Sequence, residues 1–226
     1  MITMLNCDCM EYMAGCADKA FDLAIVDPPY GVTRKGAQWS IMKDNINAYK
    51  LFDDTAPAKE YFDELFRVSK NQIIWGGNYF ILPISRGWIY WNKQTPTESY
   101  ADCELAWTSF DKNLKCFDYM WTNVKMGHGD GFKSNKPANI HPTQKPVALY
   151  KWLLSRYAKP GDKILDTHGG SGSICIACHD LGFDLTWMEL DADYFAAASK
   201  RYQEHAAQAT LFAPDEVRQP EQGILL

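Results

Sequence analysis

The sequence has no long hydrophobic run, and this excludes a membrane-spanning protein. No segment reaches the roughly 18 consecutive apolar residues that a membrane helix requires. The first residues, MITMLNCDCMEYM, lack the basic start and apolar stretch of a signal peptide. We therefore expect a cytoplasmic protein with no membrane partner.

A disulfide framework is also missing. The seven cysteines are odd in number and irregularly spaced, which argues against a disulfide scaffold. CIACH at 175–179 has the spacing of a haem-attachment site, and Cys7 and Cys9 form a close pair, but small buried hydrophobic side chains are the favoured interpretation. A zinc site needs a second ligand pair at suitable spacing, and none is visible. We expect no metal.

Strong positive charge is absent as well, because the formal net charge is −5. The charge is unevenly placed: residues 120–160 hold seven Lys and Arg against one acid, and residues 162–226 hold four against eleven. A basic segment on an acidic body can follow the phosphates of a nucleic acid. An ordinary solvated surface explains the pattern equally well, so charge alone leaves both interpretations open.

Apolar and aromatic residues are plentiful. Of the 226 residues, 46% are hydrophobic and 14% aromatic, a composition typical of a packed globular protein. We expect a single α/β domain over residues 1–207, with short polar insertions near 31–55 and 120–140 and a loose tail over 208–226.

Hydrophobic periodicity predicts strands alternating with helices. Residues 56–70 carry apolar side chains at helical spacing, and Pro146 is expected in the first turn of a later helix, where proline is tolerated. The predicted strands cover 2–7, 21–26, 71–80, 87–93, 102–110, 163–166 and 183–189, and the predicted helices cover 10–17, 56–70, 144–158, 173–181 and 192–206.

The segment FDLAIVDPPYG at 21–31 runs from a buried strand directly into an acid, two prolines and a tyrosine. Ligands of parallel sheets bind at the carboxyl ends of the strands, so Asp27 and Tyr30 are candidate site residues. Pro28 and Pro29 have no N–H to compete for the carboxylate, and they restrict the backbone around it. The alternative without function is a strand-ending turn with a helix-capping acid.

The segment DTHGGSGS at 166–173 joins a predicted strand to a predicted helix, and its glycines let the backbone approach a ligand closely. Glu189 ends the next strand, roughly 20 residues on, where a nucleoside-binding βαβ unit has its ribose-binding acid. A strict GxGxxG and a GxxxxGK[ST] are both absent, which disfavours dinucleotides and nucleoside triphosphates. A tight turn without a ligand is the alternative.

The motifs DPPY, HPTQKP at 141–146 and GGSGS at 169–173 occur in this order and are followed by Glu189. In this combination the chain resembles the β-class amino-methyltransferases of DNA, which use S-adenosylmethionine (SAM). The resemblance runs from Asp8 to about Arg201 and is weakest over 31–70 and 110–140. It implies an α/β, Rossmann-like methyltransferase fold with a doubly wound mixed sheet and a circularly permuted motif order, in which the catalytic strand comes early and the cofactor strands come last.

The resemblance also implies roles at the cofactor. Asp166 and the glycine loop would line the methionine part of SAM, Glu189 would bind the ribose hydroxyls, and Asp8 would lie near the adenine. Lys145 would pair with the methionine carboxylate. The implied cofactor-binding residues are Asp8, His141, Thr143, Lys145, Asp166, His168, Gly170, Ser171, Gly172 and Glu189.

Two residues depart from the family pattern. Family members usually have Pro and Phe after the first acid of the glycine motif, where this chain has Thr167 and His168. His168 is expected to fill the aromatic position. The departures leave an altered cofactor site open, and with it the alternative of a catalytically inactive module that binds SAM or nucleic acid.

For catalysis, the resemblance implies the set Asp27, Pro28, Pro29 and Tyr30. The amino group of a base is a poor nucleophile because its lone pair is delocalised into the ring. Asp27 would accept a hydrogen bond from one N–H and the Pro28 carbonyl from the other, and Tyr30 would stack on the base, worth roughly 1–3 kcal/mol. The target base must first leave the duplex.

The resemblance thus implies a site-specific DNA methyltransferase acting on N6 of adenine, in a restriction-modification or phage setting, within a bacterial cell or a phage-infected host. Adenine is preferred because family members with Asp at the first motif position mostly modify adenine. The closest alternative is N4 of cytosine, and a further one is an RNA or protein amide substrate.

DNA contacts are expected in loops that vary within the family. For any single lysine there, a solvated charge is still the favoured interpretation. Because these loops are short, a homodimer is one way to cover a duplex site, and family members often dimerise. The candidate DNA-binding residues are Arg34, Lys35, Lys43, Lys125, Lys133 and Lys136.

Overall fold

The computed structural model describes residues 1–31, 55–94, 101–120 and 144–208. The predicted insertions near 31–55 and 120–140 and the tail over 208–226 therefore lie almost wholly outside the described residues. The strands are β1 (Ile2–Leu5), β2 (Phe21–Val26), β3 (Ser69–Trp75), β4 (Trp88–Asn92), β5 (Cys103–Thr108), β6 (Lys115–Asp118), β7 (Lys163–Asp166) and β8 (Asp184–Met188). The helices are α1 (Cys9–Ala14), α2 (Lys59–Val68), the 3-10 turn η1 (Gly77–Tyr79), α3 (Val147–Tyr157), α4 (Ser173–Leu181) and α5 (Ala192–Ala206).

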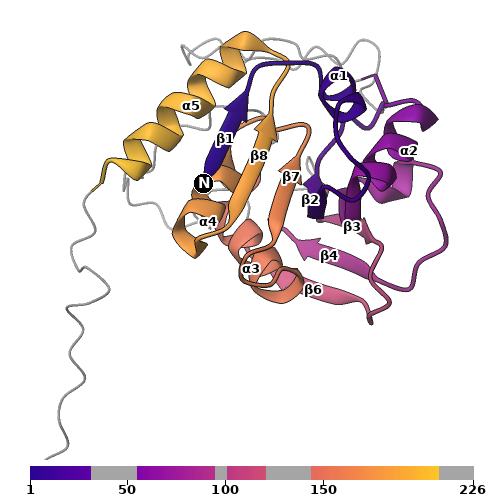
Figure 1. Ribbon diagram of the computed structural model, residues 1–226. Helices are drawn as coiled ribbons and strands as arrows, with labels where there is room; N and C mark the ends of the chain where they lie inside the picture. The colour runs from indigo at the N-terminus through magenta and orange to yellow at the C-terminus, as the bar shows by residue number, and fades with distance from the viewer. Residues whose placement is uncertain (32–54, 95–100, 121–143, 209–226) are drawn as a thin grey trace, which may run out of the picture.

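The eight strands found in the described residues form one mixed sheet in the order β1-β8-β7-β2-β3-β5-β4-β6. Neighbours from β1 to β3 run parallel, whereas β5 is antiparallel to both β3 and β4. Figure 1 shows the late strands β7 and β8, in orange, between the early strands β1 and β2, in indigo. This arrangement confirms the predicted fold class, with the strand before DPPY beside the strand before the glycine loop.

Helices cover both faces of the sheet. Along β2, Leu23 and Ile25 join one buried cluster with residues of α3, α4 and α5, while Ala24 and Val26 join a second with residues of α1 and α2. Successive strand residues point to opposite faces, so a strand buried on both sides is apolar throughout. The continuous apolar run of β2 is therefore explained by its central place.

Some element boundaries differ from the prediction. The helix predicted over 56–70 ends at Val68, because Ser69 already pairs with β2 as the first residue of β3. Pro146 precedes α3 as its N-cap residue with extended backbone, so its prediction as a first-turn residue was wrong. The strand β6 was not predicted. No helix in the described part of the chain is long and apolar enough to cross a membrane.

Candidate active site

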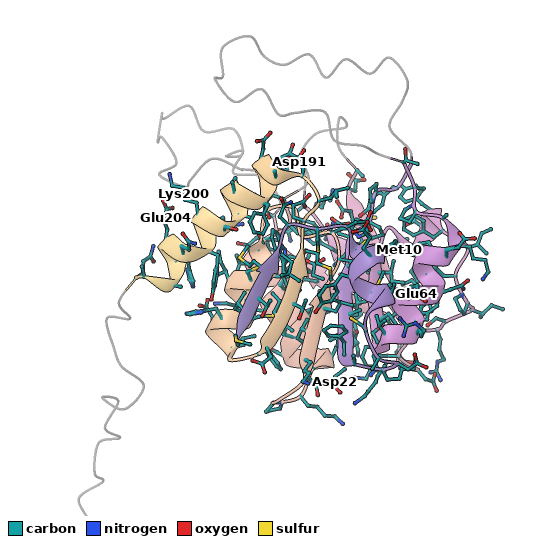
Figure 2. All side chains as sticks on the ribbon, turned by 45° about the horizontal axis from the view of Figure 1, so that its top comes forward. Met10, Asp22, Glu64, Asp191, Lys200 and Glu204 are labelled. Carbon is teal, nitrogen blue, oxygen red and sulfur yellow. The ribbon has the colours of Figure 1, made fainter. Side chains whose placement is uncertain are left out.

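A cavity of about 570 Å³ opens where β1, β2, β7 and β8 reach their carboxyl ends. Figure 2 shows two of its lining residues, Met10 and Asp191, at the end of the molecule opposite Asp22, which lies near the start of β2. The segments after all four strands contribute to its wall. Among its lining residues are Cys7, Asp8, Cys9, Asp27, Pro28, Pro29, Tyr30, Tyr61, Glu104, Gln144, Lys145, Thr167, His168, Gly169, Gly170, Ser171, Glu189 and Leu190.

The carboxylate of Asp27 is held by two donors. The Tyr30 hydroxyl donates to Oδ1 at 2.6 Å, and the Lys145 ammonium donates to Oδ2. The side chain of Asp27 is 18% exposed and lies in the cavity wall, whereas burial and the neighbouring Asp27 charge raise the pKa of Tyr30 well above its usual value. The DPPY segment thus presents an oriented carboxylate to the cavity.

The ring of Tyr30 is packed by the residues after β3. It stacks on Tyr79 with ring centroids 5.1 Å apart and meets the edge of Phe80 at 6.2 Å. Gly76 has φ +67, and a Cβ there would come within 2.2 Å of the Tyr30 ring. Only glycine allows both this conformation and this approach. The expected stacking of Tyr30 on a base stays a prediction, and Tyr79 already contacts the ring.

Lys145 connects Asp27 to a second acid, Glu104, which was not among the predicted site residues. Its Nζ lies 3.1 Å from Oε2 of Glu104 in β5, and Lys93, directly after β4, contacts Oε1 of Glu104 at 2.6 Å. The ammonium of Lys145 also lies 5.2 Å from the centroid of the Trp75 ring. The predicted pairing of Lys145 with the methionine carboxylate stays a prediction, because the contacts in the structure are to protein carboxylates.

The charges in this group support one another. Burial opposes the charged form of Glu104, but Lys145 and Lys93 outweigh it and lower the pKa of Glu104. Burial likewise opposes the ammonium of Lys145, yet Asp27 and Glu104 keep its pKa raised above the usual value. A buried charge is tolerated only when it is paired, so each member depends on its neighbours.

Glu189 ties the glycine loop to the end of β8. Its Oε2 accepts the Gly170 N–H at 2.8 Å, and its Oε1 accepts the Asp191 N–H at 2.9 Å. Asn6, after β1, donates to the carbonyls of Glu189 and Leu190 at 2.7 and 3.0 Å. These contacts hold the Glu189 carboxylate in the cavity wall, where the sequence analysis expected a ribose-binding acid.

The glycine loop lies close against β8. A Cβ on Gly169 would come within 1.8 Å of the Trp187 ring, so no larger residue fits there without movement. Gly172 precedes α4 in a left-handed conformation, and its N–H donates to the Gly169 carbonyl at 3.1 Å. Arg201 of α5 stabilises the loop by donating to the Ser171 carbonyl at 2.8 Å and to the Ser173 hydroxyl at 3.0 Å.

Asp166, at the end of β7, is buried beneath this loop and accepts the His168 N–H at 3.1 Å. Burial raises its pKa to about 8, an effect that the His168 N–H partly offsets and that the charges of Asp27 and Glu189 reinforce. The carboxyl group is not itself among the cavity-lining groups. Its predicted contact with the methionine part of SAM stays a prediction.

Thr167 and His168, the two departures from the family pattern, make polar contacts to α2. The Thr167 hydroxyl lies 2.7 Å from the Tyr61 hydroxyl and 3.0 Å from Nδ1 of His168. The rings of His168 and Tyr61 meet edge to face at 5.1 Å. Burial lowers the pKa of His168 to about 4, so a neutral ring forms this part of the wall near neutral pH.

Asp8 has a structural contact in addition to its place in the cavity wall. Its Oδ1 accepts the N–H groups of Met10 and Glu11 at 2.6 and 3.3 Å and so caps α1. Such a cap stabilises a helix by about 1 kcal/mol. The wall of one cavity thus includes Asp8, Glu189 and the glycine loop, and the predicted contact of Asp8 with the adenine stays a prediction.

The remaining predicted site residues are not described. His141 and Thr143, and all of the candidate DNA-binding residues, lie outside the described residues: Arg34, Lys35, Lys43, Lys125, Lys133 and Lys136. Across the described part of the chain, no group of three His, Cys, Asp or Glu side chains is arranged to hold a metal ion.

Sequence reasoning missed Glu104, Lys93, Tyr61, Asn6 and Arg201. A signal existed for the first two, because each is a single charged residue in or beside an otherwise apolar strand. The antiparallel register that pairs Glu104 with Trp91 brings it close to Lys93, but this register is visible only in the fold. The other three lie on elements whose packing partners are far away in the sequence.

The chain is similar in sequence to two type II methyltransferases. The type II methyltransferase M.HpaI of Haemophilus parainfluenzae is 24% identical over 221 residues, covering 81% of this chain and 68% of that protein. M.HinfI of Haemophilus influenzae, also a type II methyltransferase, is 24% identical over 249 residues, covering 89% and 68%.

Two solved structures share the fold. The M1.HpyAVI–SAM complex superposes with a TM-score of 0.54 at 21% identity, covering 89% of this chain and all of that one. The cytosine-N4-specific PvuII DNA methyltransferase superposes with a TM-score of 0.56 at 11% identity, covering 91% and 90%.

The family match is decisive for assignment. The N6_N4_Mtase family, described as DNA methylase, matches residues 88–200, which is half of the chain and includes the HPTQKP segment, the glycine loop and Glu189. The chain therefore belongs to the N6_N4_Mtase family of DNA methylases.

Proposed function

We propose that this protein transfers a methyl group from SAM to the exocyclic N6 of adenine in a specific DNA sequence, after the target base has been flipped out of the duplex. The observation that carries the proposal is the single cavity of about 570 Å³ that contains both Asp27 of DPPY and the glycine loop with Glu189. A methyl donor held by the loop and an amine held at Asp27 would therefore be neighbours.

The residues present fit SAM. Glu189 and Asp8 offer acceptor oxygens in the cavity wall, and the loop at 169–171 forms another part of the wall, next to Glu189. The absence of a side chain at Gly169 lets the loop backbone lie directly against the Trp187 ring, since an added Cβ would collide with that ring. When bound, SAM supplies an electrophilic methyl group on a sulfonium. M1.HpyAVI, whose complex contains SAM by its title, has the same fold.

The DPPY residues would orient the amine. Asp27 would accept one N–H of the base, and the carbonyl of Pro28 the other, which favours the pyramidal nitrogen that attack requires. Tyr30 and Lys145 each donate to a different oxygen of Asp27, so the carboxylate is fixed before the base arrives. Preorganised acceptors of this kind lower a barrier because no reorientation is needed during reaction.

The choice of adenine rests on Asp27. Family members with Asp at the first position of this motif mostly modify adenine, as the sequence analysis noted. Cytosine presents the same kind of amino group to an acceptor, so N4 of cytosine is the alternative. PvuII methyltransferase, which shares the fold, is named for N4 of cytosine.

The test is to incubate the purified protein with DNA and methyl-labelled SAM, digest the DNA to nucleosides and identify the labelled one by mass spectrometry. We expect N6-methyladenine. N4-methylcytosine in its place would contradict the choice of base. Label in parallel RNA or protein samples but not in DNA would contradict the substrate, and label in none of them would favour an inactive binding module.

DNA binding and a homodimer are part of the proposal. The short insertions near 31–55 and 120–140 would contact the duplex, and a second subunit would extend the contacted site. Sedimentation velocity with and without DNA tests the second point. We expect a dimer in at least one condition, and monomers in both at working concentration would contradict it.

A further inference from the structure

We propose that Glu104 is a positioning residue for methyl transfer and acts on Asp27 through Lys145. This inference rests on the proposed methyl transfer to a base amine, and it adds a residue that lies on β5, outside the DPPY segment and the glycine loop. Glu104 does not need to touch either substrate. Its effect would pass through the ammonium that it shares with Asp27.

The contacts form an alternating row of charges. Asp27 contacts Lys145, Lys145 lies 3.1 Å from Glu104, and Glu104 lies 2.6 Å from Lys93. The acid at the head of this row, Asp27, belongs to the DPPY segment in the cavity wall. Lys145 and Glu104 also line the cavity, so the row follows the cavity wall to Lys93, which directly follows β4.

The fold places these groups from separate elements. Glu104 pairs across the sheet with Trp91, and Ala106, two residues further along β5, pairs with Trp75 at the end of β3. Glu104 therefore stands just beyond the end of β3, on the same face as these two tryptophans. Lys145 approaches this face from the segment before α3, which packs there.

Burial makes the pairing necessary. The side chain of Lys145 is 3% exposed, and that of Glu104 is 22% exposed. Lys145 lies above Trp75, and Lys93 lies 5.4 Å from the centroid of the Trp91 ring. An ammonium so withdrawn from water binds strongly to whatever carboxylate is near. With Glu104 present, Lys145 is shared between two acids.

The chemistry explains why sharing matters. As the amine attacks the methyl group, its nitrogen gains positive charge, which a nearby carboxylate stabilises and a nearby ammonium opposes. Glu104 balances the ammonium of Lys145, so that Asp27 keeps its negative potential toward the amine. Without Glu104, Lys145 would neutralise Asp27 alone and compete with the amine for its oxygens.

The experiment is a double-mutant cycle with Glu104→Gln, Lys145→Met and the combined variant. Single-turnover methyl transfer to DNA at saturating SAM is measured for each, with SAM dissociation constants and thermal unfolding alongside. We expect Glu104→Gln to slow transfer about 10- to 100-fold while the SAM dissociation constant changes by less than about twofold. The combined variant is expected to match Lys145→Met alone, because Glu104 acts only through Lys145.

Asp22→Asn is the matched control, because it breaks an ion pair with Lys70 of 2.6 Å at the opposite end of the sheet. Its transfer rate is expected to be unchanged. If Glu104→Gln does not fold, the combined variant is compared with Lys145→Met, since that pair leaves no unpaired Lys145 charge. A difference in transfer rate between those two variants would overturn the inference.

Three results would overturn the inference: an unchanged rate in Glu104→Gln, effects of the two substitutions that multiply in the combined variant, or a loss that is confined to SAM affinity. The parent protein distinguishes failure of the inference from failure of the proposed function. If the parent protein transfers methyl groups to N4 of cytosine, the transfer rates of the double-mutant cycle are measured for that reaction. If it transfers none to DNA, both the function and the inference are wrong.

Discussion

Lys145 donates to the carboxylate of Asp27 across 118 positions of the chain. This contact joins the HPTQKP segment to DPPY, while Glu189 joins the glycine loop to the end of β8 in the wall of the same cavity. The two motifs on which the proposed methyl transfer depends are thus held by separate contacts.

Gly76→Ala is expected to damage the active site through Tyr30. The new Cβ would come within 2.2 Å of the Tyr30 ring, and φ +67 would be strained, by about 1–2 kcal/mol, for any residue but glycine. Moving the ring breaks the 2.6 Å hydrogen bond to Asp27. We expect methyl transfer to fall about 10- to 100-fold, measured at saturating SAM.

Gly182→Ala is the control for this variant. Gly182 has φ +73, and a Cβ there meets no atom within 4 Å. It therefore carries the backbone strain without the collision, and we expect it to lower the melting temperature but leave transfer intact. Equal losses of activity in the two variants would show that Tyr30 packing is irrelevant.

Arg201→Met is expected to weaken cofactor binding. Arg201 bonds to the Ser171 carbonyl and the Ser173 hydroxyl behind the glycine loop, and its loss frees the loop. We expect KM for SAM to rise about tenfold with little change in kcat, the pattern of lost ground-state binding.

Lys200→Met, one residue earlier, controls for the loss of positive charge on α5. Lys200 is 78% exposed and lies 3.8 Å from Glu204, and both are labelled on α5 in Figure 2. We expect the KM for SAM of Lys200→Met to equal that of the parent protein. A fall in kcat rather than a rise in KM for Arg201→Met would contradict the assigned role.

Asp166 is expected to make stability fall as pH rises. Its pKa in the folded protein is about 8, against an ordinary value of 3.8, so the folded state binds more protons than the unfolded state between these pH values. Stability contributed by the protonated acid is complete below about pH 4 and is lost as pH rises through 8. Asp166→Asn cannot ionise and removes this dependence.

Urea unfolding without SAM at pH 5 and pH 8.5 tests this point. The difference in unfolding free energy, Asp166→Asn minus parent, is expected to be more positive at pH 8.5 by about 1–3 kcal/mol. An equal difference at both pH values would mean that Asp166 titrates normally.

His168 is expected to make the stability of the fold decrease as pH falls through the acidic range. Burial lowers its pKa to about 4 from 6.5, so the unfolded state binds more protons between these values. The stability that the neutral ring contributes is therefore complete above about pH 6.5 and is lost as pH falls toward 4.

His168→Phe retains a ring that does not titrate, and its unfolding free energy relative to the parent is expected to rise by about 1–2 kcal/mol from pH 7 to pH 4.5. The exposed His179→Phe serves as control, and a His168→Phe curve parallel to the parent's would contradict the assignment.

The sequence predicted those parts of the fold that depend on local patterns. The bounds of α4 and α5 agree with the predicted helices, because glycines flank the first and Asp191 caps the second. The meeting of DPPY with the glycine loop followed from the strand-end rule and from the family resemblance. In contrast, the contacts of Glu104 and Lys93 depend on the antiparallel register of β4 and β5.

Long-range packing explains the other differences. Tyr61 lies on the buried face of α2 and shows helical spacing, yet its hydroxyl meets Thr167 across 106 positions. Nothing near either residue in the sequence indicates this partner. In the sequence, Thr167 and His168 therefore appear only as departures from the family motif. In the structure, they form a group of polar contacts with Tyr61 of α2.

The most direct test of the account is Asp27→Asn, which keeps the size of the side chain and removes its charge. Methyl transfer to DNA and SAM affinity are measured on the same preparation, with the parent protein beside it. We expect transfer to fall at least about 100-fold while the SAM dissociation constant stays within about twofold. Transfer at the parent's rate would contradict the account, because the carboxylate in this cavity would then have no part in the reaction.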